Sequence, residues 1–236
     1  MSRETPRELV PFSEGQLWTA WRPQRFYGIE MGTRMTLCRL SGGALWVHSP
    51  IDVGASEADR IRALGPVTHI VAPSRIHHLY AADFARHFPG AALHGSPRLP
   101  AKRPELCFAS VLGDTPDPGW AADLDQCLMR GNRYLDEVVF FHRASRTLIL
   151  ADLLEEGNRD WPLASRIAAR LAGIYGRHGP PRDMKLLFRH DKRATRDSVE
   201  RILAWDFDRI ILSHGSLVRE NGREVFRAAY AFALSW

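Results

Sequence analysis

Residues 67–95, VTHIVAPSRIHHLYAADFARHFPGAALHG, decide the fold of this chain. They begin with the apolar run Val67–Ala72, which is typical of a buried strand. An adjacent pair of histidines, His77 and His78, follows this strand. Three aromatic side chains then recur at helical spacing, and we expect this stripe to pack in the core: Tyr80, Phe84 and Phe88. The Pro-Gly pair at residues 89–90 ends the predicted helix.

The segments on either side alternate between strand-like and helix-like patterns. Apolar, β-branched and aromatic residues predict further strands at residues 16–21, 34–40, 44–49, 105–113, 124–130, 137–142, 147–152 and 209–212. Two of these strands flank residues 143–146 and predict a hairpin. Helical spacing predicts four more helices: one capped by Ser56 and closed by Gly65, one from Asp160 with Leu163, Ile167, Leu171 and Ile174 on one face, and two at residues 195–205 and 221–234.

The predicted order is strands followed by helices, and it occurs twice along the chain. We therefore predict an α/β fold class with two sheets face to face and helices outside, a four-layer αββα sandwich. The same periodicities also allow a doubly wound sheet. The 236 residues suffice for one large core, so we expect a single domain over residues 1–236.

The composition excludes several classes of function. The net charge is +5, and 32 basic residues face 27 acidic ones. Most of the basic residues are arginines that alternate with acids, and no basic stretch is interleaved with aromatic residues, so nucleic-acid binding is not expected. The three cysteines are odd in number and lack CxxC spacing, which argues against a disulfide framework and against a cysteine zinc site.

The expected location is the cytoplasm. Residues 1–10 are charged and have no apolar run behind them, so we expect no secretory signal. No stretch of about 18 apolar residues occurs, so we expect no membrane partner. The expected partner is a small-molecule substrate, and the sequence sets no oligomeric state.

Three predicted strand ends carry side chains that bind metals. His77 and His78 follow the first of these strands, Asp152 ends the second and His214 follows the third. Ligands in open α/β sheets gather outside the carboxyl ends of strands. Imidazole nitrogens together with a carboxylate suit zinc or iron. Taken one at a time, each junction also allows a plain reading as a helix cap or a turn residue.

The sequence around these residues resembles that of a known protein family. Residues 67–95 resemble the segment of the metallo-β-lactamase superfamily in which a strand ends in the motif HxHxDH and a helix follows. The resemblance extends from Met35 to about Val218 and is closest to an uncharacterised, domain-of-unknown-function branch, through the phrases LWVHSP and DEVVFFHRASRTLI. It implies the αββα fold and a metal cofactor, with Asp152 similar to the metal-bridging aspartate and His214 to the final histidine.

The chain departs from that motif in a way that implies one metal. Pro73 and Arg75 stand where the first two histidines are expected, His77 stands in place of the aspartate, and Asn132 replaces a later histidine. The resemblance therefore implies that the first metal site is lost. The set that remains for a single divalent metal, zinc before iron, is His77, His78, Asp152 and His214.

Three other residues are further candidates. The Arg75 guanidinium would lie where the first metal is lost, and it would hold a substrate's carboxylate or phosphate. His48 stands where the superfamily often has a supporting aspartate, so it would donate to a ligand or act as an extra one. Glu137 is a candidate ligand or base, and Asp152 or Glu137 would then handle protons. A hydrogen-bonded structural role is the alternative for His48 and Glu137.

Three functional hypotheses follow from the sequence. The first is a metal-dependent hydrolase that acts on a small ester, amide or phosphoester. The second is an iron-dependent redox enzyme of the same fold. The third is a non-catalytic ligand-binding or interaction module that needs no metal. The substrate stays open, because the pocket walls would come from the loops at residues 22–32, 114–120 and 153–160.

Overall fold

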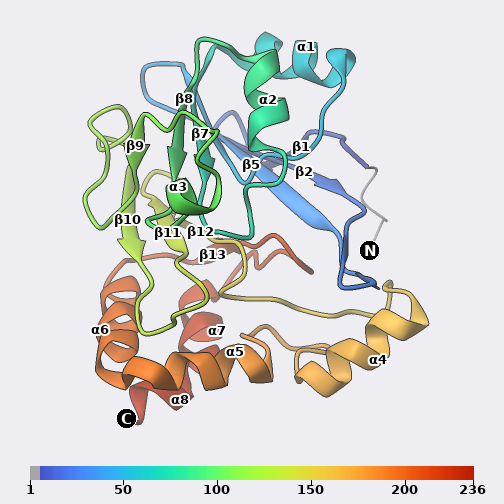
Figure 1. Ribbon diagram of the computed structural model, residues 1–236, viewed down its shortest axis with the longest axis vertical. Helices are drawn as coiled ribbons and strands as arrows, with labels where there is room; N and C mark the ends of the chain where they lie inside the picture. The colour runs from blue at the N-terminus through green and yellow to red at the C-terminus, as the bar shows by residue number, and fades with distance from the viewer. Residues whose placement is uncertain (1–5) are drawn as a thin grey trace.

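Two β-sheets lie between layers of helices in the computed structural model, which describes residues 6–236 (Figure 1). The strands are β1 (Val10–Ser13), β2 (Leu17–Arg22), β3 (Arg25–Phe26), β4 (Ile29–Glu30), β5 (Thr33–Arg39), β6 (Leu45–His48), β7 (Val67–Ala72), β8 (Ala92–Gly95), β9 (Ser110–Val111), β10 (Leu124–Leu128), β11 (Val138–His142), β12 (Thr147–Ile149) and β13 (Arg209–Ile211). The helices are α1 (Ala55–Leu64), α2 (Ala81–His87), α3 (Leu99–Lys102), α4 (Leu163–Ala172), α5 (Arg182–Leu187), the 3-10 turn η1 (Phe188–Asp191), α6 (Lys192–Leu203), α7 (Gly222–Ala229) and α8 (Ala231–Leu234). The expectation of no secretory signal concerns in part residues 1–5, which lie outside the described residues.

The larger sheet has the strand order β1-β2-β5-β6-β7-β8-β9, and the smaller one has the order β10-β11-β12-β13. Strands β2, β5 and β6 pair antiparallel, whereas β6, β7 and β8 run parallel because helices connect them. In the smaller sheet, β11 and β12 form the predicted hairpin and β13 pairs parallel with β12. The ends of β12 and β13 therefore lie at the same edge of this sheet.

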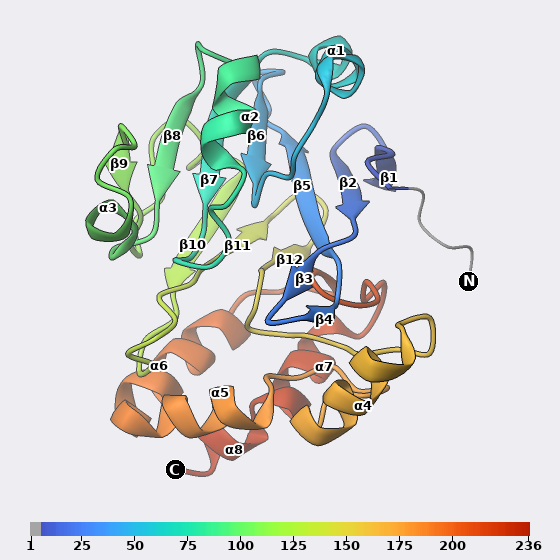
Figure 2. The same cartoon turned by 45° about the vertical axis from the view of Figure 1, so that its right-hand side comes forward.

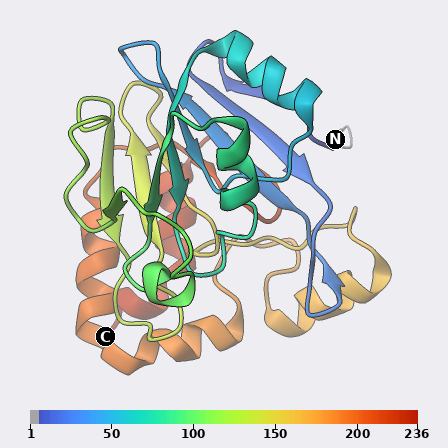
Figure 3. The same cartoon turned by 45° about the horizontal axis from the view of Figure 1, so that its top comes forward.

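Three apolar clusters fill the spaces between the four layers. The first cluster packs the larger sheet against α1 and α2 through side chains such as Val47, Ile61 and Phe84. The second lies between the sheets and includes Trp46 and Phe140. The third packs the smaller sheet against α5 to α8. Figure 3 shows α1 and α2 over one side of the sheets and the orange and red helices over the other.

This arrangement confirms the predicted αββα sandwich and excludes the doubly wound alternative, because two separate sheets share a common core. The core role predicted for the aromatic stripe of α2 is confirmed for Phe84 and Phe88, which are buried. Tyr80 differs, because it precedes the helix and its hydroxyl donates to the Gln24 side chain. The single-domain organisation over residues 1–236 stays a prediction.

Several element boundaries differ from the predicted ones for local reasons. Gly54, and not Ser56, is the N-cap of α1, because the Glu57 carboxylate accepts the Gly54 backbone N–H. The helix predicted at residues 221–234 is interrupted at Tyr230, whose buried hydroxyl donates to the Leu153 carbonyl. The strand predicted at residues 105–113 is only Ser110–Val111.

Three of the four residues of the predicted apolar face of α4 point outward, whereas Ile174, beyond the end of the helix, is buried. Leu163, Ile167 and Leu171 are 63, 50 and 72% exposed. The helix instead buries Ser165 and Ala169, and the Ser165 hydroxyl accepts the backbone N–H of Glu30. The hairpin of β3 and β4 consequently lies against α4, as Figure 2 shows. In the view of Figure 2, the contact between α4 and this hairpin closes one side of the space below the two sheets.

Two expectations about the chain as a whole concern cysteines and membranes. All three cysteines are free thiols: Cys38 and Cys127 are buried, whereas Cys107 is exposed. Among residues 6–236, no helix has both the length and the apolar character needed to cross a membrane.

Candidate metal centre

Three side chains from three strand ends meet at one edge of the two sheets. His77 lies in the loop after β7, Asp152 follows β12 and His214 follows β13. These are the only three residues of types His, Cys, Asp and Glu within residues 6–236 whose ligand atoms all lie within 4.8 Å of one another. The parallel pairing of β12 and β13 places the last two of these residues side by side, and β7 brings the first from the opposing sheet.

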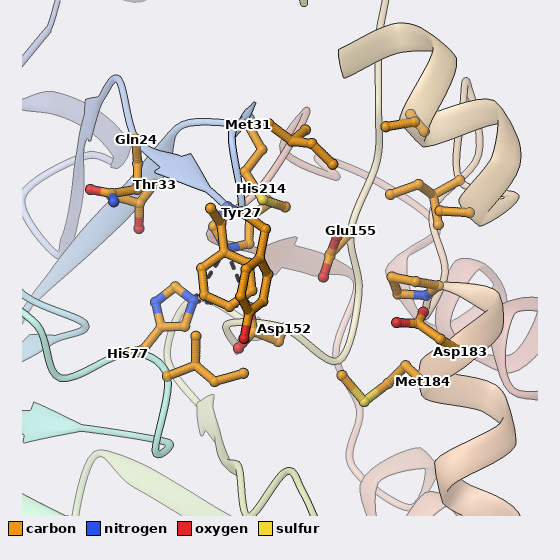
Figure 4. Close-up of a pocket in the computed structure, with 18 of the residues that line it drawn as sticks. Gln24, Tyr27, Met31, Thr33, His77, Asp152, Glu155, Asp183, Met184 and His214 are labelled. Atoms are coloured by element: carbon orange, nitrogen blue, oxygen red, sulfur yellow. Dashed lines mark hydrogen bonds and ion pairs between the residues drawn. The ribbon is translucent and has the colours of Figure 1, made fainter. Parts of the chain in front are cut away.

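The ligand atoms of this cluster are closely spaced. The His77 Nε2 atom lies 3.0 Å from Asp152 Oδ1, and the His214 Nε2 atom lies 3.2 Å from the same oxygen. The two Nε2 atoms are 3.2 Å apart. All three side chains are buried, and dashed lines mark these contacts in Figure 4.

Hydrogen bonds behind the two imidazoles set which nitrogen faces the cluster. The Nδ1–H of His214 donates to the Gly32 carbonyl over 2.6 Å, so the Nε2 atom of the neutral ring carries a bare lone pair. On His77, Nδ1 pairs with the Ser49 hydroxyl over 2.7 Å, so Nε2 is the nitrogen that faces the cluster. A carbonyl or hydroxyl behind an imidazole is the usual arrangement of a histidine that binds a metal.

The donor set fits a cation. Burial alone would raise the pKa of Asp152, but the charges and hydrogen bonds of His77 and His214 outweigh burial and lower that pKa below its usual value. The other carboxylate oxygen, Oδ2, is buried and has no hydrogen-bond partner within residues 6–236. The two Nε2 atoms and Oδ1 of Asp152 converge on one point, where a cation would accept all three as ligands. Two nitrogens and one carboxylate match known divalent metal sites.

The local backbone holds His77 in place. The Ser74 hydroxyl accepts the backbone N–H groups of Ile76 and His77, which fixes the loop after β7. Ser49 has a φ of 51°, a left-handed conformation that is strained for a residue with a Cβ atom. Its N–H donates to the Val71 carbonyl, and this bond keeps the hydroxyl on His77. Strain of this kind is typical of functional sites.

His78, the fourth ligand predicted from the sequence, is placed outside the cluster. The Arg103 guanidinium donates to its Nδ1 atom over 2.9 Å, so the neutral ring carries its proton on Nε2. Burial, followed by the charges of Lys102 and Arg103, lowers the pKa of His78 to about 4. The structure therefore assembles three of the four predicted ligands.

His48 is also outside the cluster. Its ring stacks on Trp46 with centroids 5.7 Å apart and meets the edge of Phe140, within the core between the sheets. Burial, followed by the charge of His77, lowers its pKa to about 3, so the ring is neutral. The neighbouring Ser49 supports the ligand instead, and the sequence reasoning missed this residue.

Glu137 supports the centre from behind. Its carboxylate accepts the backbone N–H groups of Ala151 and Asp152 over 2.6 and 2.8 Å. The side chain is fully buried, and burial, followed by the charge of Asp152, raises its pKa well above the usual value. Glu137 is therefore placed to position the segment that carries Asp152 and has no access to a substrate, unlike the base expected from the sequence.

Arg75 does not reach the centre. Its guanidinium donates to the backbone carbonyls of Arg133 and Tyr134, and its Nε atom lies 3.5 Å from a carboxylate oxygen of Asp136. These contacts hold the loop at residues 133–136. The role expected from the sequence, a guanidinium that holds a substrate anion, is not supported by this placement.

A cavity of about 460 Å³ lies directly over the cluster. Its walls come mainly from the hairpin of β3 and β4, the loop after β7, and helices α4 and α5 (Figure 4). Most of the wall is apolar, and its large side chains are Phe26, Tyr27, Ile29, Met31, Ile76, Leu79, Tyr80, Tyr134, Trp161, Ile174, Met184 and Leu187. A concave, mostly apolar cavity with a few convergent polar groups is the usual form of a small-molecule site.

Glu155 also lines the cavity, and the sequence reasoning missed it. Only 8% of Glu155 is exposed, and its side chain makes no hydrogen bond within residues 6–236. Figure 4 shows its carboxylate pointing into the cavity. Burial raises the pKa of Glu155 to about 8; the charge of His214 opposes this shift and that of Asp152 adds to it. A carboxyl of this kind exchanges a proton near neutral pH.

We expect Glu155→Gln to stabilise the metal-free protein at alkaline pH. Between pH 4.5 and about 8 the folded state holds a proton on Glu155 that the unfolded state has lost, so stability falls as pH rises through this window. Removing this charge should raise the free energy of unfolding at pH 9 by on the order of 3 kcal/mol, since one pKa unit is about 1.4 kcal/mol. Urea unfolding at pH 5 and pH 9 measures the effect, and an equal change at both pH values would contradict it.

The whole fold is similar to solved metallo-β-lactamases. One from Pontibacter korlensis is 12% identical over 97% of this chain and 99% of its own, with a TM-score of 0.64. One from Pseudomonas aeruginosa, in a mono-zinc form, is 14% identical over 99% and 97%, with a TM-score of 0.62. A variant of a flavo di-iron protein from Thermotoga maritima is 11% identical over 97% and 63%, with a TM-score of 0.63. The protein thus has the metallo-β-lactamase fold.

Sequence comparison places the chain more narrowly. The family model described as "Domain of unknown function (DUF4336)" matches residues 14–173. The chain belongs to this family, which agrees with the branch to which its sequence is similar. No curated protein matches the chain in sequence.

Proposed function

We propose that His77, Asp152 and His214 bind one divalent metal ion, zinc before iron, and that the protein is a hydrolase of a small ester, amide or phosphoester. The observation that carries this proposal is the convergence of two imidazole Nε2 atoms and the Asp152 carboxylate at the floor of an apolar cavity. A zinc ion bound by such a set acts as a Lewis acid and makes water more acidic.

The surrounding residues have separate roles in this proposal. Ser49 and Gly32 orient the two imidazoles, and Glu137 positions Asp152 through the backbone. Glu155 holds a proton in the cavity and is the candidate general acid and base. The apolar wall excludes water from the reacting group, which strengthens each electrostatic contact.

A redox enzyme that uses iron is the second candidate. Two histidines and one carboxylate are also the ligands of non-haem iron oxygenases. The arrangement of His77, His214 and Asp152 is therefore a specific observation in favour of iron. Iron as the dominant metal in the purified protein, together with visible absorption, would favour this candidate over the hydrolase.

The test begins with elemental analysis of protein purified without added metal. The proposal predicts close to one equivalent of a transition metal, with zinc in excess of iron. Less than about a tenth of an equivalent, after incubation with either metal, would contradict it and leave the non-catalytic module, since a site with these ligands binds tightly at neutral pH.

Hydrolysis is tested with a panel of uncharged aryl esters and anilides. The expected result is turnover that stops on chelation and returns with zinc. Asp152→Ala should abolish this turnover, whereas Asp160→Asn, an exposed carboxylate outside the cavity wall, should leave it unchanged. Turnover that survives both chelation and Asp152→Ala would contradict a role for the centre.

A further inference from the structure

The wall of the cavity contains no lysine or arginine within residues 6–236. The chain has 32 lysines and arginines, yet none of them lines the cavity within residues 6–236. Those next to the wall are engaged behind it: Arg22 pairs with Asp52 and lies 4.6 Å from the centre of the Tyr80 ring, while Arg75 donates to the Tyr134 carbonyl. A carboxylate or phosphate on a bound molecule would therefore find no guanidinium or ammonium partner.

Three carboxyl groups line the same cavity instead. Asp152 lies in the metal centre, Glu155 lies on the wall beside it, and Asp183 lies on the wall formed by α5 (Figure 4). Glu155 and Asp183 have no ion pair and no side-chain hydrogen bond within residues 6–236. Like charges repel each other, so Asp183, and Glu155 once it has lost its proton, disfavour an anion in the cavity.

The mouth of the cavity is apolar. Within residues 6–236, ten large apolar side chains are exposed, and five of them line the cavity: Phe26, Tyr27, Leu79, Tyr134 and Leu187. Four others lie on α4 and α5, the helices that form one wall. An apolar surface gathered around an opening marks a binding site for apolar molecules.

We propose that the cavity binds an apolar molecule whose polar end is uncharged or cationic, and that it rejects carboxylates and phosphates. Because this proposal concerns the substrate, it rests on the proposed hydrolase function. It narrows the substrate to an ester, amide or phosphoester whose groups outside the metal centre are neutral or carry an amine. Asp183 and, above about pH 8, Glu155 are the residues that determine this specificity, because they are the carboxyl groups of the wall outside the centre that have no partner within residues 6–236.

Binding to the metal-free full chain tests this proposal independently of the metal. The probes are octanol, octyltrimethylammonium, octanoate and octyl phosphate, which share one chain and differ in the polar end. Calorimetric titration at pH 9, where Glu155 has lost its proton, should give about tenfold tighter binding of the first two than of the last two. Equal or tighter binding of octanoate or octyl phosphate would overturn the proposal.

Three variants show whether the probes bind in the cavity. Ala168→Trp fills it from a half-buried position on α4 and should abolish binding of octanol. Glu155→Gln and Asp183→Asn should each reduce the preference for octyltrimethylammonium over octanol about threefold, whereas the matched control Asp160→Asn should not. Octanol binding that survives Ala168→Trp would overturn the proposal, as would an unchanged preference in both carboxyl variants.

The experiments that would contradict the metal site and the specificity of the cavity give different results. A chain that binds no metal would leave the ranking of the four probes unchanged. A reversed ranking would leave the metal stoichiometry unchanged.

Discussion

Asp152→Ala is expected to lower the affinity for zinc by at least about 100-fold. The change removes the only anionic ligand and leaves two imidazoles, and even the loss of a group that merely supports a ligand costs roughly 10–100-fold. His214→Ala should have a similar effect, because the Nε2 atom of His214 lies 3.2 Å from both other ligand atoms. Competition with a chromophoric chelator measures the affinity.

His78→Asn is the matched control for this prediction. His78 is adjacent to His77 and is part of the ligand set expected from the sequence, but its Nδ1 atom accepts from Arg103. The variant should bind zinc within about threefold of the parent protein, whereas Ser49→Ala should lose roughly tenfold. A loss in His78→Asn as large as in Asp152→Ala would favour the four-ligand set over the three-ligand one.

Gly215→Ala is expected to have the largest effect on stability. Gly215 has a φ of 109°, and a Cβ atom there would lie 2.3 Å from the backbone oxygen of Glu156. The same turn holds His214, whose carbonyl accepts the Glu156 N–H. We expect the free energy of unfolding to fall by about 3 kcal/mol or more, because neither the strain nor the clash can relax without moving His214.

Urea unfolding measures this loss, with Gly90→Ala as the control. Gly90 is exposed, and a Cβ atom there would meet no atom within 4 Å. The control should change the stability by less than about 0.5 kcal/mol. Equal stability of the two variants would show that the turn after His214 is not constrained.

The layers of the fold and part of the centre follow from the sequence. The apolar runs before His77, Asp152 and His214 predict buried strands, and polar ligands after such runs fall at strand ends. The two sheets and the hairpin of β11 and β12 agree with these patterns. Gly215 has a positive φ, which a glycine adopts without strain, and it allows the tight turn after His214.

The directions of individual side chains did not follow from the sequence. Strand β6 is buried on both faces, so its residues show no alternation that would tell His48 from Ser49. In the pair His77 and His78, the hydrogen bonds of Ser74 and the position of Arg103 decide which ring faces the centre. Both decisions depend on contacts between residues far apart in the chain.

Long-range packing also decided the two features that define the cavity. Helical spacing predicts the apolar stripe of α4, but only its contact with the β3 and β4 hairpin shows that Ser165 and Ala169 face inward. Glu155 stands in an acidic pair, EE at residues 155–156, and nothing in that pattern marks it as buried. Its lack of a partner is a property of the folded wall.

A crystal structure of the zinc-soaked protein, with anomalous scattering recorded at the zinc edge, tests the central claim most directly. We predict one anomalous peak within bonding distance of His77 Nε2, His214 Nε2 and an oxygen of Asp152, on the order of 2.0–2.2 Å for each ligand. A peak bound instead by His78 or His48, or no peak at all with the three side chains in place, would contradict the three-residue metal centre.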